Sequence, residues 1–149
     1  MISNILVPTD GSKTARKAAK YAVELAKQTG ATIKLLSVVD RGFSSVQAIP
    51  ASAAPTHLIE PIEDYLTQVA EDYLKDAESL CGENGISSKK VIRSGHPVEE
   101  IVKEAVASKV DLIVMGSHGR SAIKAAVLGS VTYGVIHKES KTPVLVVRR

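Results

Sequence analysis

Short, uninterrupted apolar runs alternate along this chain with segments in which apolar residues recur every three or four positions. The runs have the length of buried strands, and the spaced segments have the periodicity of helices with one apolar face. Strands are predicted at residues 5–7, 33–39, 90–93, 111–115 and 144–147, and helices at residues 15–26, 62–80, 98–106 and 130–138. This alternation predicts a parallel sheet with right-handed crossovers and helices on both faces. We therefore expect one α/β domain over residues 1–149, an open five-stranded Rossmann-like fold.

Glycine and proline mark the ends of several predicted elements. Gly30 follows the first predicted helix, at a position where glycine often ends a helix. Pro97 falls in the first turn of the third helix, which tolerates proline. Residues 40–56 carry two prolines and no sustained apolar period, so they are predicted to form a loop.

The single cysteine restricts the class of protein. Because Cys81 has no partner within the chain, no internal disulfide can form, which favours a reducing compartment. The N-terminal sequence MISNILVPTD lacks the basic and apolar regions of a signal peptide. No apolar run approaches the length that spans a membrane. We therefore predict a cytoplasmic protein with no membrane partner.

The net charge of +3 is mildly basic, and the basic residues are not segregated along the sequence. The longest basic clusters are the pairs Lys89-Lys90 and Arg148-Arg149. A nucleic-acid-binding protein usually has a basic stripe or a recognisable reading motif. We therefore predict no nucleic-acid partner, and the positive balance fits an anionic small ligand or has no particular role.

The residues that follow the predicted strands are the candidates for a binding site. In an open α/β sheet, ligands bind beyond the carboxyl ends of the strands, near the point where the strand order reverses. Residues 8–12 follow the first strand, Asp40 follows the second, and residues 116–120 follow the fourth. A site is therefore predicted at this edge of the sheet.

Two glycine-containing turns at this edge favour phosphate binding. Gly116 and Gly119 lie just beyond the fourth strand, where absent side chains let backbone N–H groups approach a ligand. Gly129 and Ser130 open the last helix, whose N-terminus offers unpaired N–H donors and a favourable dipole. The alternative is that the first two glycines only form a tight turn and Ser130 only caps the helix.

Several common nucleotide and catalytic motifs are missing. The chain has no G-x-x-x-x-G-K-[ST], and the first strand is followed by PTDGS rather than by a dinucleotide-binding glycine motif. His57, His96 and His137 have no cysteine or carboxylate at metal-ligand spacing, so no metal site formed by protein residues is predicted. Ser12 and Ser130 lack an evident His–acid partner, so no catalytic residue is assigned.

The spacing Gly116-x2-Gly119-x9-Gly129-Ser130 resembles the glycine signature of the ATP-binding branch of the universal stress protein family. The similarity extends over nearly the whole chain, through ILVPTDGS, SVVD, SGHPVEEIVKEA and KTPVLVVRR. The resemblance implies an adenine nucleotide alpha hydrolase-like fold, ATP as ligand with Mg²⁺ held through its phosphates, and a homodimer formed through the last strand. It matches residues 40–56 least, so contacts there are not assigned.

The resemblance also implies a role for each matching position. Pro8, Thr9 and Asp10 would line the pocket, with the Asp10 carboxylate accepting from ribose hydroxyls and assisting Mg²⁺. Val39 would meet adenine through its backbone, and Met115 would pack nearby. The residues that would hold or flank ribose and phosphates are Gly116, His118, Gly119, Arg120, Gly129, Ser130, Val131 and Thr132.

Some of these positions have equally simple structural explanations. Asp10 is suited to a turn and to the N-cap of the first helix, because Asp-Gly-Ser favours turns. His118 is as consistent with an exposed loop position as with function, and Lys124 fits a solvated surface charge better than a ligand contact.

Three functions remain open on the sequence. The favoured one is an ATP-binding regulatory stress-response protein that acts as a homodimer and is not an enzyme. The second is a slow ATPase or phosphotransferase that uses the same pocket, with His118, Arg120 and Asp10 as its parts. The third is a structural dimer that binds no nucleotide.

Overall fold

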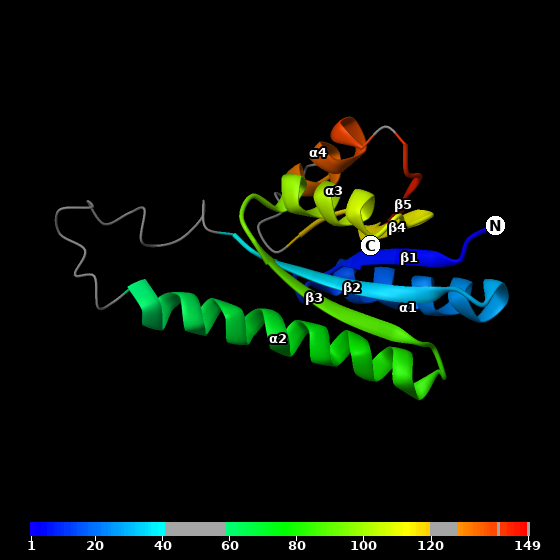
Figure 1. Ribbon diagram of the computed structural model, residues 1–149, viewed down its shortest axis with the longest axis horizontal. Helices are drawn as coiled ribbons and strands as arrows, with labels where there is room; N and C mark the ends of the chain where they lie inside the picture. Colours follow the sequence, from blue (N-terminus) through cyan, green and yellow to red (C-terminus); the bar gives the residue numbers. More distant parts are fainter. Residues whose placement is uncertain (41–58, 120–127, 140, 149) are drawn as a thin grey trace.

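The computed structural model describes residues 1–40, 59–119, 128–139 and 141–148, and its elements alternate in the predicted order (Figure 1). The elements are β1 (Asn4–Pro8), α1 (Lys13–Thr29), β2 (Thr32–Val39), α2 (Ile59–Glu83), β3 (Ser88–Ser94), α3 (Pro97–Ala107), β4 (Leu112–Gly116), α4 (Ser130–Lys138) and β5 (Val144–Val147). The predicted loop at residues 40–56 falls almost wholly outside the described residues.

All five strands are parallel and lie in the order β3-β2-β1-β4-β5. Ile5 of β1 is paired with Ile33 of β2 on one side and with Leu112 of β4 on the other. The strand order therefore reverses between β1 and β4, which is the position at which open α/β sheets bind ligands. The predicted open α/β fold is confirmed.

Helices cover both faces of the sheet, with α1 and α2 on one face and α3 and α4 on the other (Figure 1). Successive strand side chains point to opposite faces. Val7 accordingly packs in the core beneath α1 and α2, whereas its neighbour Leu6 packs beneath α3 and α4. Both side chains are fully buried, as expected for strands covered on two sides.

Local hydrogen bonds set the ends of α1. The Ser12 side chain accepts from the Ala15 N–H at 3.2 Å, so Ser12 is the N-cap. Gly30 has φ 76° and its N–H donates to the Ala26 carbonyl at 2.8 Å, which ends the helix as predicted.

Four strands differ from their predicted bounds: β1 gains one residue at each end, β2 begins one residue earlier, and β3 and β4 differ for reasons that the contacts show. β3 is longer than predicted because it pairs with β2 along its full length, from Ile33 opposite Ser88 to Val39 opposite Ser94. β4 begins one residue later, at Leu112. The Asp111 carboxylate accepts the N–H groups of Ser3 and Asn4 at 2.8 and 2.9 Å, and these bonds lower its pKa.

Candidate functional site

A cavity of about 570 Å³ opens at the carboxyl edge of the sheet, above the ends of β2, β1 and β4. This volume is within the usual range for small-molecule sites, roughly 300–1,000 Å³. The described residues that line it are Pro8, Thr9, Asp10, Ser12, Ala15, Leu36, Val38, Asp40, Pro97, Ile101, Met115, Gly116, His118, Gly119 and residues 128–133.

Of the predicted binding residues that the structure describes, the cavity brings together all except Val39. Val39 is 7% exposed, and its carbonyl accepts the N–H of Gly95 at 3.0 Å. Its neighbours Val38 and Asp40 line the cavity instead. Arg120 lies outside the described residues, as does Lys124.

The turn after β1 forms one wall of the cavity. The Thr9 N–H donates to the Leu36 carbonyl at 2.8 Å, which extends the β1–β2 pairing into the turn. The Asp10 carboxylate accepts the Ser12 N–H at 2.9 Å, and Gly11 has φ 74°. The turn role expected for Asp10 is therefore present. The N-cap role expected for Asp10 is wrong, because the N-cap is Ser12, whose hydroxyl accepts the Ala15 N–H in the first turn of α1.

The two glycine turns lie against each other. The Gly129 N–H donates to the Ser117 carbonyl at 2.7 Å, and the Thr132 hydroxyl donates to the Gly116 carbonyl at 2.7 Å. A Cβ added at Gly129 would lie 3.3 Å from His118 Cα, tighter than most Cβ contacts. The turn that follows β4 and the first turn of α4 therefore form one compact unit.

The N-terminus of α4 supplies backbone donors at this unit. Gly129 is the N-cap, and the first bond within the helix runs from the Tyr133 N–H to the Gly129 carbonyl at 2.9 Å. The helix itself therefore offers no acceptor to the N–H groups of residues 130–132, which lie at the positive end of its dipole. The alternative that Ser130 acts as the cap is wrong, because Gly129 is the N-cap and Ser130 is the first residue of the helix.

The other two glycines have packing roles within the protein. A Cβ at Gly116 would lie 2.7 Å from the carbonyl carbon of Thr14, so this glycine lets β4 approach α1. A Cβ at Gly119 would lie 2.7 Å from the Asp10 carboxylate. These glycines therefore bring the turns after β1 and β4 together, in addition to any contact with a ligand.

His118 is held by the same unit. Its Nδ1 lies 2.9 Å from the Ser117 hydroxyl, and its carbonyl accepts a hydrogen bond from the Thr14 hydroxyl. Ser117 is only 1% exposed, whereas the His118 side chain lines the cavity. The His118 backbone is thus fixed between α1 and β4.

Part of the cavity wall is apolar. It is formed by Leu36 and Val38 at the end of β2, by Pro97 and Ile101 in the first turns of α3, and by Met115. The two α3 residues were not among the predicted binding residues, because their spacing is that of a helix packing into the core. The signal that could have found them is Pro97 itself, which begins a helix just after a strand end.

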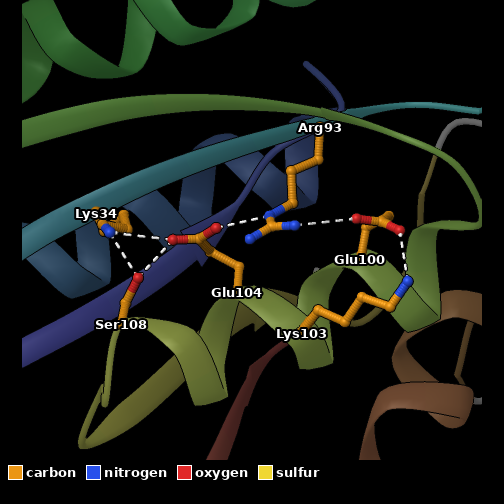
Figure 2. A network of polar contacts seen from close by, with 6 residues as sticks. All are labelled: Lys34, Arg93, Glu100, Lys103, Glu104 and Ser108. Carbon is orange, nitrogen blue, oxygen red and sulfur yellow. Dashed lines mark hydrogen bonds and ion pairs between the residues drawn. The ribbon is translucent and has the colours of Figure 1, made fainter.

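A polar network fixes α3 against β2 and β3 (Figure 2). The buried Glu104 carboxylate accepts from Arg93 Nε at 2.6 Å, from Lys34 Nζ at 3.0 Å and from the Ser108 hydroxyl. Arg93 also pairs with Glu100 at 3.3 Å. Burial alone would raise the pKa of Glu104, but the bonds from Ser108, Arg93 and Lys34 outweigh it and lower the pKa to about 2. The network therefore holds the helix that forms the apolar wall.

Among the described residues, no group of three or more His, Cys, Asp or Glu side chains is placed to hold a metal ion.

Burial raises the pKa of the Cys81 thiol, which packs in the core between α2 and the sheet. No helix in the described part of the chain combines the length and the apolar character needed to cross a membrane.

An open parallel α/β sheet with a glycine-bounded cavity at its switch point defines the class of this protein. The sequence profile of the universal stress protein family matches residues 1–148, and the chain belongs to this family. Universal stress protein MJ0531 of Methanocaldococcus jannaschii is 35% identical over 149 residues, which cover 100% of this chain and 84% of that protein. Universal stress protein MJ0577 of the same organism is 36% identical over 157 residues, covering 100% and 96%.

Solved structures agree with this assignment. The structure of MJ0577 has a TM-score of 0.86 and 36% identity, covering 100% of this chain and 97% of that one. The universal stress protein UspA from Lactobacillus plantarum has a TM-score of 0.81 and 26% identity, covering 99% and 98%.

Proposed function

We propose that this protein binds an adenine nucleotide, with ATP as the preferred form, in the cavity at the carboxyl edge of the sheet. The observation that carries the proposal is that the glycine turn after β4 packs against the N-terminus of α4, at the edge of the cavity. Backbone N–H groups at a helix N-terminus suit a phosphate, and the N–H groups of residues 130–132 are available there. The base would occupy the apolar part of the cavity, between β2 and α3.

A similar solved structure supports a nucleotide as the ligand class. A universal stress protein solved in complex with cAMP has a TM-score of 0.67 and 26% identity, and the match covers 99% of this chain. The polar edges of the cavity fit the remaining parts of a nucleotide. Asp10 lines the cavity and would accept from ribose hydroxyls, and Mg²⁺ would enter with the phosphates, near the same carboxylate.

The proposed activity is regulated binding rather than catalysis. Efficient phosphoryl transfer needs cationic stabilisation of the phosphates and a group that positions the nucleophile. Of the described residues that line the cavity, none is lysine or arginine. The Asp10 carboxylate is also engaged by the Ser12 N–H. Turnover of ATP above about one per second, the lower end for typical enzymes, would contradict this proposal.

The proposed assembly is a homodimer formed through β5. The two edges of the sheet differ: β3 carries Lys89 and Lys90, which protect an edge from pairing, whereas β5 is a run of half-buried Val and Leu. Pro143 and Val147 accept hydrogen bonds from the β4 side, so the backbone of Val146 between them is directed outward. Two β5 strands would then pair across a two-fold axis.

Nucleotide binding is tested by calorimetric titration of ATP into the wild type and the Gly129→Val variant. Gly129 has φ −71° and ψ 159°, which valine adopts readily, so the substitution acts through the crowded space around its Cβ. We expect micromolar binding by the wild type and at least a tenfold loss in the variant. The control is Gly82→Val, because no atom lies within 4 Å of a Cβ at Gly82. No wild-type affinity below the millimolar range would refute the proposal.

The β5 dimer is tested with Val146→Pro. Proline removes an N–H that faces away from β4, so the sheet within one protomer should survive. Sedimentation should show a dimer for the wild type and a monomer for the variant, with unchanged nucleotide affinity. A wild type that sediments only as a monomer would remove the proposal.

A further inference from the structure

The outer face of α1 and α2 carries opposite charge on its two halves. We call this surface the α1/α2 face. Its exposed basic residues on α1 are Lys13, Arg16, Lys17, Lys20 and Lys27, beside the single exposed acid Glu24. Its exposed acidic residues on α2 are Asp64, Glu71, Asp72, Asp76 and Glu83, beside the single exposed base Lys75. Charge that is not segregated along the sequence is therefore segregated on this surface, because residues three and four apart gather on one side of a helix.

The two halves lie side by side at the same level. Both helices connect neighbouring parallel strands on one face of the sheet, so they run in the same direction (Figure 1). Arg16 Nη2 lies 4.0 Å from the Asp76 carboxylate. Along the direction of the helix axes, the basic first turns of α1 therefore lie beside the acidic C-terminal half of α2. A groove of about 370 Å³ runs between them, with Lys20 and Glu83 among its lining residues.

We propose that the α1/α2 face binds a second copy of this chain, with α1 of each copy lying over α2 of the other. A two-fold axis that runs along the groove, parallel to the helices, places α1 of one copy over α2 of the other. It leaves the position of each helix along its own axis unchanged. Each basic turn around Lys17 would then face the acidic stretch between Asp72 and Glu83 of the other copy. A two-fold axis across the helices would instead place α1 on α1, where like charges repel. Charge complementarity therefore selects one arrangement.

The size of the face predicts weak association that depends on salt. α1 has 17 residues and is therefore about 25 Å long, and two helices side by side are about 20 Å wide. The contact would cover roughly 500 Å² of each copy, less than the ~800 Å² of a standard interface. Its charges are exposed, with Arg16 and Asp76 side chains 62% and 71% accessible, so added salt screens them. The contact uses exposed residues of α1 and α2, whereas the proposed dimer uses the backbone of β5, at the edge of the sheet.

A charge swap tests the proposal. One variant carries Lys17→Glu and Lys20→Glu, and a second carries Asp72→Lys and Glu83→Lys. Each variant alone would place like charges over one another in both halves of the contact. A mixture of the two restores opposite charges in both halves. Sedimentation velocity of the wild type at 20 mM NaCl should show a species larger than that at 500 mM NaCl, each variant alone should lack it, and the equimolar mixture should regain it.

The control variant is Lys89→Glu with Lys109→Glu, which changes the same amount of charge outside α1 and α2. Lys90 pairs with Glu78 of α2 at 2.8 Å, so its neighbour Lys89 points to the other face of the sheet. This variant should keep the salt-dependent species. If a double variant fails to fold by circular dichroism, the single changes Lys17→Glu and Asp72→Lys serve instead.

Three results would overturn the proposal. The first is a wild type whose size is the same at both salt concentrations up to millimolar protein. The second is a mixture that remains as small as its separate variants. The third is binding of a poly-glutamate peptide that is lost in the Lys17→Glu, Lys20→Glu variant while the wild type shows no self-association. That outcome would assign the basic half to an acidic partner.

Discussion

Replacing Glu104 by glutamine should destabilise the protein by an amount that depends on pH. The drop in the pKa of Glu104 from 4.5 to about 2 corresponds to about 3 kcal/mol of folding stability at neutral pH. Glutamine keeps the shape of the side chain but removes the charge that Arg93 and Lys34 bond. At pH 7 we therefore expect Glu104→Gln to lower the free energy of unfolding by about 3 kcal/mol.

The pH dependence gives this prediction a second test. Because the folded-state pKa lies below the unfolded value, the contribution of Glu104 is complete well above pH 4.5 and is lost as the pH falls towards 2. The difference between wild type and variant should therefore shrink to about 2.5 kcal/mol at pH 4 and about 1.5 kcal/mol at pH 3. Urea unfolding followed by circular dichroism measures the difference at each pH.

The matched control is Glu99→Gln on the same helix. Glu99 pairs with Lys138 at 3.3 Å, but its side chain is 52% exposed, so the loss should stay below about 0.5 kcal/mol. A Glu104→Gln variant that differs from the wild type by no more than this control would refute the account of the network. So would a difference that is the same at pH 7 and pH 3.

Three further substitutions test local features by the same unfolding assay. Gly116→Ala places a Cβ 2.7 Å from the Thr14 backbone, so we expect a loss of about 1–3 kcal/mol, and an unchanged stability would contradict the close packing. Gly30→Ala meets no atom within 4 Å but requires φ 76°, so the loss should be about 1 kcal/mol and purely conformational. Ser12→Ala removes the side-chain cap of α1 and should lower the free energy of unfolding by about 1 kcal/mol. An unchanged stability would show that the Ser12 hydroxyl does not cap the helix.

The order and type of the elements could be predicted from the sequence because each has a strong period. The run at residues 111–115 and the stripe of α1 leave little choice between strand and helix. The ends of elements depend on contacts that no local pattern carries. β3 extends to Ser88 only because β2 pairs with it there. Asp111 lies just before β4, and its carboxylate accepts the N–H groups of Ser3 and Asn4.

The candidate site could be predicted where it follows strand ends and turns. Gly119 and Gly129 could be predicted as cavity residues because glycine just after a strand or at the start of a helix lets the backbone approach a ligand. The apolar wall could not be found in this way, since Ile101 has the spacing of an ordinary core residue and reaches the cavity only because α3 crosses the end of β2. The charged halves of α1 and α2 likewise emerge only when the helices are placed side by side.

Backbone amide NMR can show whether the phosphates bind at the N-terminus of α4. ATP and adenosine are titrated separately into ¹⁵N-labelled protein, and the amide shifts of residues 130–132 are compared. We expect these amide shifts to move strongly with ATP and little with adenosine, whereas residues beside Ile101 respond to both ligands. This expectation is contradicted if ATP leaves the amides of residues 130–132 in place, or if its largest shifts fall in the groove between α1 and α2.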